Sequence, residues 1–144
     1  MRRKILVVDD DPDQLEVACW CLKKAGFAIS TAANGVDALA KTRSVLPDLI
    51  VLDLMLPELN GLDFCKTLRK DPVTASIPII MLTGMRSEFS RLAGLESGVN
   101  LFLTKPYSPE ELVSKVEEML KRSSKQPKAR VKSKMETGGS RLNK

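Results

Sequence analysis

Short apolar runs alternate with amphipathic helical patterns along the first 122 residues of the chain. We expect strands at the following apolar runs: Lys4–Val8, Ala28–Thr31, Leu49–Asp53, Ile77–Leu82 and Leu101–Leu103. A helical pattern follows each of these runs. Alternation of strands with helices is typical of βα repeats around a parallel sheet. The pattern therefore predicts an α/β domain built from five βα units.

Residues that favour helix starts and stops bound the expected helices. In chain order the helices are expected from Pro12 to Gly26, from Val36 to a point before Pro47, from Leu62 to Asp71, from Ser87 to Glu96, and from Ser108 onward. The last start is the clearest, because Ser108, Pro109 and Glu111 form a capping box with proline at the first helical position. Its apolar stripe consists of Leu112, Val113, Val116, Met119 and Leu120.

Polar residues with chemical potential stand where these strands end. Asp9 and Asp10 follow the first strand, and Asp53 ends the third. Thr83 follows the fourth strand, and Lys105 comes shortly after the fifth. Right-handed crossovers place all the strand C-termini at one edge of a parallel sheet, where ligands bind. We therefore expect these five side chains to meet in one pocket.

The chemistry of that pocket follows from its charges. Three carboxylates brought together repel one another, and a bound divalent cation is the usual relief. Hard oxygen ligands in small number favour Mg²⁺. With Lys105 as a fixed positive charge, the pocket has room for one tetrahedral anion, and Asp53 can serve as a nucleophile. The set predicts phosphoryl transfer.

The charge of the chain divides it into two parts. The formal net charge is +5, but residues 1–122 hold 16 Lys and Arg against 17 Asp and Glu, whereas residues 123–144 hold seven basic residues against one acidic residue. We therefore expect one domain over 1–122 and a basic tail over 123–144 whose composition is typical of disorder. Nucleic-acid binding is expected only weakly, through this tail.

Other features of the sequence narrow the setting. It has no apolar run of 18 residues and no secretory signal, and its three cysteines are poor disulfide material, so we expect a cytoplasmic protein without membrane contact. Cys19 and Cys65 lie on apolar stripes and are expected in the core, whereas Cys21 lies off the stripe. The chain has no histidine, so a phosphohistidine donor must come from elsewhere.

The strand-end residues, taken together, resemble the signature of the receiver domain of bacterial two-component response regulators, of the stand-alone type. Over about residues 3–122, the likeness rests on the paired acids, on Asp53, on Thr83 before the small Gly84, and on Lys105 before Pro106. The resemblance implies a flavodoxin-like, doubly wound five-stranded parallel sheet with strand order 2-1-3-4-5. It also implies that Asp53 accepts a phosphoryl group from a histidine kinase or a phosphotransfer protein.

The same resemblance implies roles for the neighbouring residues. Asp10, Asp53 and the backbone carbonyl of Met55 would bind Mg²⁺, with Asp9 assisting through water. Lys105 would contact the phosphoryl group through a cis peptide bond to Pro106, Thr83 would move to hydrogen-bond it, and Phe102 would turn inward as a switch. The face of the fourth helix, fifth strand and fifth helix would then meet an output protein or a second copy of the chain. Because Met55 and Met85 hold the two positions that tune hydrolysis and neither can position water, we expect a persistent phosphorylated state.

Several alternatives stand beside this interpretation. The chain can be the receiver part of a larger regulator, or an adaptor whose pocket is unused. A haloacid-dehalogenase-type phosphatase also uses a strand-end aspartate with Mg²⁺, but it needs a second acid where this chain has Met55. We therefore expect no enzymatic turnover beyond the chain's own phosphotransfer and autodephosphorylation. Asp11 is interpreted as a helix N-cap rather than a ligand, and Phe102 as either a switch or an ordinary core residue.

Overall fold

The computed structural model describes residues 2–57, 59–84 and 96–125. Its centre is one parallel sheet with strand order β2-β1-β3-β4-β5, as expected. The strands are β1 (Lys4–Val8), β2 (Ala28–Ala32), β3 (Leu49–Asp53), β4 (Ile79–Thr83) and β5 (Leu101–Thr104). In the register of the sheet, Val8 lies beside Leu52 and Asp53 lies beside Leu82. The strand ends that carry polar residues therefore share one edge.

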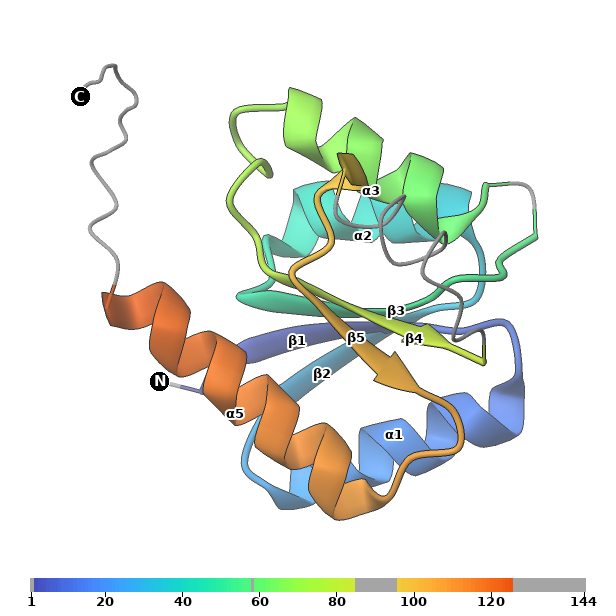
Figure 1. Cartoon of the computed structure of the whole chain (residues 1–144), viewed down its shortest axis with the longest axis vertical. Coiled ribbons are helices and arrows are strands. Elements are labelled where there is room, and N and C mark those ends of the chain that lie inside the picture. Colours follow the sequence, from blue (N-terminus) through green and yellow to red (C-terminus); the bar gives the residue numbers. More distant parts are fainter. Residues whose placement is uncertain (1, 58, 85–95, 126–144) are drawn as a thin grey trace.

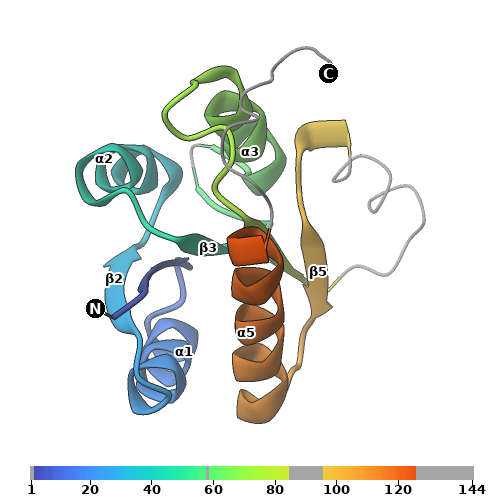
Figure 2. The ribbon, with the colours of Figure 1, turned by 90° about the vertical axis from the view of Figure 1, so that its left-hand side faces the viewer.

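Helices cover both faces of the sheet (Figures 1 and 2). α1 (Pro12–Lys24) and α5 (Pro109–Lys125) lie on one face, and α2 (Gly35–Val45) and α3 (Gly61–Lys70) lie on the other. Most of the helix expected at Ser87–Glu96 lies outside the described residues, although residues 96 and 97 are helical and Gly98 follows with a φ of 98°. The arrangement is the expected doubly wound fold.

The three central strands, β1, β3 and β4, are mainly apolar and buried, as is typical of a parallel sheet covered on both faces. Successive side chains alternate between the two layers: Ile5, Val7, Leu49 and Val51 pack toward the α1/α5 side, and Leu6, Val8, Ile50 and Leu52 pack toward the α2/α3 side. The largest helical contribution to the second layer is Phe64, which is fully buried. Two packed layers thus hold β3, and Asp53 at its end, in the centre of the molecule.

Side-chain caps fix where the helices begin. Asp11, Asn34 and Asn60 each accept a hydrogen bond from a backbone N–H in the first turn of the helix that follows. The expected capping box of α5 is formed in both directions, with Ser108 N–H donating to Glu111 and Glu111 N–H donating to the Ser108 hydroxyl, each at 3.1 Å. The interpretation of Asp11 as an N-cap is therefore confirmed.

The start of the fourth strand differs from the prediction. β4 begins at Ile79, whereas the apolar run predicted Ile77. The N–H of Ile77 bonds back to the Thr74 carbonyl at 3.2 Å, and Pro78 has no N–H to offer a neighbouring strand. These two residues therefore close the connection from α3 before the strand starts. At the other end of the domain, α5 continues to Lys125, and residues 126–144 of the expected tail lie outside the described residues.

The expectation for Cys21 is wrong, because Cys21 is buried at 5% exposure although it lies off the apolar stripe. Cys19 is half-buried and packs against the core on the same side of the sheet, and Cys65 is buried as expected. The reason is that α1 packs against α5 as well as against the sheet, so its buried surface is wider than a single stripe. Cys21 faces a hollow shared with Pro109 and Val113 of α5.

Candidate functional site

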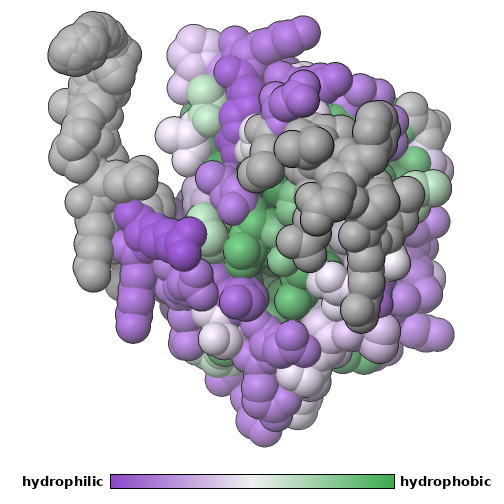
Figure 3. Space-filling model, in the orientation of Figure 1, coloured by the Kyte–Doolittle hydropathy of each residue, from purple (hydrophilic) through white to green (hydrophobic). Residues whose placement is uncertain are grey.

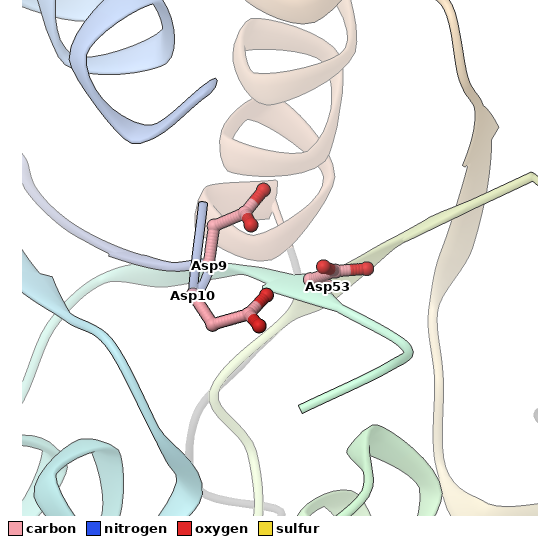
Figure 4. Close-up of side chains that lie close together, drawn as sticks. All are labelled: Asp9, Asp10 and Asp53. Carbon is pink, nitrogen blue, oxygen red and sulfur yellow. The ribbon is translucent and has the colours of Figure 1, made fainter. Parts of the chain in front are cut away.

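The acidic residues at the sheet edge come together as the sequence predicted. Asp9 follows β1, Asp10 comes next, and Asp53 is the last residue of β3. Figure 4 shows the three side chains grouped at this edge, and each offers a carboxylate oxygen within 4.8 Å of the others. Asp9 and Asp53 are buried, whereas Asp10 is exposed. The cluster is therefore walled on one side and open to solvent on the other.

Lys105 supplies the positive charge of the site. Its Nζ lies 3.4 Å from Asp9 Oδ2 and 3.5 Å from Asp53 Oδ2. Its backbone N–H donates to the Thr83 carbonyl at 2.8 Å, which ties the residue after β5 to the end of β4. The Lys105–Pro106 peptide bond is cis, as the resemblance implied. One ammonium therefore pairs with two of the three carboxylates, and the ionised cluster keeps a net negative charge.

The environment of Asp53 disfavours its charged form. Burial raises the pKa of the Asp53 carboxyl above its ordinary value, and the nearby charge of Asp9 raises it further. Lys105 and the Met55 N–H, which donates to Asp53 Oδ1 at 3.3 Å, act in the opposite direction. The carboxylate is thus positioned by hydrogen bonding but only partly compensated in charge. A further cation would complete the compensation.

The donor set fits Mg²⁺. This ion prefers oxygen ligands, takes one or two carboxylates and keeps several waters. Asp9, Asp10 and Asp53 offer only oxygen, and the exposed side of Asp10 leaves solvent access for the waters. Within the described ranges, no second group of three acidic, histidine or cysteine side chains is gathered closely enough to hold a metal ion.

The remaining predicted residues surround this cluster. Thr83 ends β4 and is buried. The Met55 side chain is 70% exposed, whereas its main chain reaches Asp53. Phe102 is half-buried and packs against the core layer on the α2/α3 side. Met85 lies outside the described residues. The structure therefore brings together Asp9, Asp10, Asp53 and Lys105. Phe102 lies within β5, three residues before Lys105.

Sequence reasoning did not single out Tyr107. Its ring is half-buried, and burial together with the charges of Asp9, Cys21 and Asp53 raises the pKa of its phenol to about 12. The phenol therefore stays neutral beside an acidic site. Tyr107 also lines a surface hollow with Val17 and Pro106 next to Lys105. Its position in the sequence, directly after Lys105 and Pro106, could have indicated that Tyr107 lies near the site.

Comparisons with known proteins identify chains that are similar to this one. A family model described as the response regulator receiver domain matches residues 5–117. The DNA-binding response regulator MtrA of Mycolicibacterium smegmatis is 42% identical over 127 residues, which cover 88% of this chain and 54% of that protein. The alkaline phosphatase synthesis transcriptional regulatory protein PhoP of Bacillus subtilis is 43% identical over 123 residues, 85% of this chain and 50% of that one. The chain thus spans about half the length of these relatives.

Solved structures show the same architecture. The chemotaxis protein CheY4 of Vibrio cholerae superposes with a TM-score of 0.79 and 32% identity, covering 82% of this chain and 98% of that chain. A CheY-like receiver domain protein from Methanospirillum hungatei gives a TM-score of 0.83 at 28% identity, with 88% and 100% covered. In the described part of the chain, no helix is both long and apolar enough to cross a membrane.

Proposed function

The chain belongs to the response regulator receiver domain family of two-component systems, and from that premise we propose that Asp53 accepts a phosphoryl group from a histidine kinase or a phosphotransfer protein. The single observation that carries this proposal is the surroundings of Asp53. A buried carboxylate stands 3.5 Å from the Lys105 ammonium and within 4.8 Å of two other carboxylates. A nucleophile between a fixed cation and a cation-binding acidic pair suits phosphoryl transfer.

The proposed step forms one bond and breaks one bond. An oxygen of Asp53 attacks the phosphorus of the donor, the bond between phosphorus and the donor's imidazole nitrogen breaks, and an acyl phosphate results. Lys105 is close enough to Asp53 to donate to a phosphoryl oxygen after transfer. Asp9, Asp10, Asp53 and the backbone carbonyl of Met55 would hold Mg²⁺, which when bound supplies charge neutralisation at the phosphoryl oxygens.

The phosphodonor must come from outside the chain, because the sequence contains no histidine. The hollow beside Lys105 gives it a place of approach, with Val17 of α1 exposed at 54% on one side and Pro106 on the other. Trp20, one turn further along α1, is exposed at 60%. Exposed apolar side chains along α1, of which Val17 lines the hollow beside Lys105, fit a protein donor better than a small molecule alone.

Transfer is proposed to change the face around β5. Thr83 and Phe102 would respond to the new phosphoryl group and shift the population of this face between two arrangements. Figure 3 shows apolar residues at the surface over β5, where Leu101 and Phe102 are half-buried. The output is either a separate protein or a domain beyond this chain; the relatives named above as DNA-binding or transcriptional regulators, of which this chain spans half, favour the second.

The phosphorylated state is proposed to be persistent. Met55 exposes an apolar thioether beside the site and cannot orient an attacking water by hydrogen bonding. Met55→Asn introduces a side chain that can. We expect the variant to lose its phosphoryl group several-fold faster than the wild type when decay is followed by intact mass after removal of the donor. Equal decay in the two proteins would contradict this role of Met55.

The test of the main proposal is intact-mass measurement after incubation with Mg²⁺ and a small acyl phosphate. We expect one phosphoryl adduct on the wild type, labile to base and to hydroxylamine as an acyl phosphate is, and none on Asp53→Ala. Asp63→Ala is the matched control, because Asp63 is exposed on the first turn of α3; it should retain the adduct. An adduct of equal size and lability on Asp53→Ala would place the acceptor elsewhere. Repeated turnover of an external phosphate ester would instead support the phosphatase alternative.

A further inference from the structure

The described residues of the connection between β3 and α3, 54–57 and 59–60, are anchored to the core beside the acidic cluster. Leu54 and Leu56 are buried at 8% and 9% exposure, and Leu59 packs against the same core layer. The N–H of Gly61 donates to the Leu54 carbonyl at 2.9 Å and closes the loop at its base. Met55 alone among these apolar residues turns its side chain outward. The loop therefore presents the main chain of Met55 to the site from a packed platform.

Leu59 packs directly against Gly35, which has no side chain to obstruct it. Gly35 is the first residue of α2 and is buried. A Cβ added at Gly35 would lie 2.5 Å from Leu59 Cβ and 3.0 Å from Leu59 Cδ2, well inside contact distance. Because the Cβ of Leu59 is fixed to its main chain, no rotamer change can relieve the clash. Any side chain at Gly35 must therefore displace the loop itself.

Space, rather than backbone conformation, is what requires glycine at this position. The φ of Gly35 lies outside the left-handed range, unlike that of Gly26 or Gly98. The chain therefore has glycine at a point where α2 contacts the loop closely.

The loop in turn positions the nucleophile. The Met55 N–H donates to Asp53 Oδ1 at 3.3 Å, so a shift of the loop changes the orientation of the Asp53 carboxylate. We infer that Gly35 is a positioning residue for the cation site: by seating Leu59, it sets how closely the main chain of Met55 approaches Asp53 and the acidic cluster. This inference rests on the proposed function, because it concerns the affinity of that site for Mg²⁺.

The test is calorimetric titration of the full chain with Mg²⁺ alone. Gly35→Ala and Leu59→Ala approach the contact from opposite sides, since one adds the clash and the other removes the seated side chain. We expect each to weaken Mg²⁺ binding roughly tenfold, the size of effect typical when a residue that supports a metal ligand is lost. Gly26→Ala is the matched control: a Cβ there meets nothing within 4 Å, but its φ of +102° is strained, and it precedes β2 at the opposite edge of the sheet. It should lose stability and keep its Mg²⁺ affinity within twofold.

A second readout separates positioning from general destabilisation. In phosphorylation by a small acyl phosphate, raising the Mg²⁺ concentration should bring the rates of Gly35→Ala and Leu59→Ala most of the way back to the wild-type rate, because it restores cation occupancy, although a changed orientation of the Asp53 carboxylate would persist. If Gly35→Ala does not fold, Leu59→Ala decides. If the wild type binds Mg²⁺ and both variants keep the same Mg²⁺ affinity as Gly26→Ala, this inference is overturned but the proposed function is not. A wild type that binds no Mg²⁺ would overturn the proposed function and this inference with it.

Discussion

Neutralising Asp53 should make the metal-free protein more stable. The Asp53 side chain is only 12% exposed, and its charged form is held beside the buried carboxylate of Asp9. Asp53→Asn keeps the size of the side chain and an oxygen that can accept the Met55 N–H. The substitution therefore removes the charge while leaving packing and the local hydrogen bond in place. Its effect on the free energy of unfolding measures what the charge costs.

The magnitude follows from three opposing contributions. At an effective dielectric constant of about 20, repulsion from Asp9 at 4.8 Å is about 3.5 kcal/mol, and attraction to Lys105 at 3.5 Å is about 4.7 kcal/mol. Since 4.8 Å is the upper limit of the separation, these two nearly cancel. The penalty for burying the ion, several kcal/mol in real proteins, then decides the sign. We expect Asp53→Asn to raise the free energy of unfolding by about 2 kcal/mol at pH 7.

The pH dependence has a definite sign. The folded-state pKa of Asp53 lies above its ordinary value of 3.8. At pH values between 3.8 and the folded-state pKa, the folded protein therefore binds more protons than the unfolded chain. Stability of the wild type from this group therefore falls as the pH rises through that window. Below pH 3.8 both states are protonated and the advantage of Asp53→Asn should vanish. Above the folded-state pKa the advantage should reach a plateau.

Urea unfolding in the presence of a chelator, from pH 3.5 to pH 8, tests this prediction. Asp63→Asn is the control, because Asp63 is exposed in the first turn of α3 and its removal should cost about 0.5 kcal/mol or less. Adding Mg²⁺ should stabilise the wild type more than Asp53→Asn, since a ligand that binds only the folded state raises stability by mass action. An Asp53→Asn variant no more stable than the wild type at pH 7 without Mg²⁺ would refute the reasoning.

Three further predictions concern other parts of the molecule. Leu46 ends α2 with a φ of 51° and is 46% exposed, so Leu46→Gly should raise the free energy of unfolding by about 1 kcal/mol in urea titrations. The Arg69 guanidinium makes five hydrogen bonds to oxygens in the connections before β4 and β5; Arg69→Met should lower that free energy by about 3 kcal/mol, seen as a lower urea midpoint. Lys105→Met should bind Mg²⁺ yet form the Asp53 adduct about a hundredfold more slowly in a mass-spectrometric time course.

The sheet could be predicted from sequence because its strands are buried on both faces. Runs such as Leu49–Asp53 are continuous and apolar, and the polar residue that ends each run marks the edge of the sheet. Strand starts were harder to predict, since β4 begins only after the turn that bonds Ile77 to Thr74. Phe64 and Cys21 were not identified as core residues, because a single apolar stripe does not reveal that a helix touches two neighbours.

The site was predictable for a different reason. Parallel topology alone brings Asp9, Asp53 and Lys105 to one edge, so their place in the chain was sufficient to group them. The contact between Gly35 and Leu59 follows from no such rule. It depends on the path of one loop over a helix from another βα unit, and neither residue carries chemistry that a sequence pattern can register.

The burial that makes the charged form of Asp53 costly would also make the site depend on a cation. A carboxylate in water would be charged and ready at neutral pH without help, but it would bind a phosphoryl group no more selectively than any surface acid. Here burial and Asp9 raise the pKa of Asp53, and Lys105 compensates only part of the charge. A divalent ion that completes the compensation would therefore both stabilise the charged nucleophile and attract the anionic donor. If Asp53 is the phosphoryl acceptor, the lower stability of the metal-free fold and the selectivity of the proposed phosphoryl transfer would have one physical origin, and Asp53→Asn should remove both together.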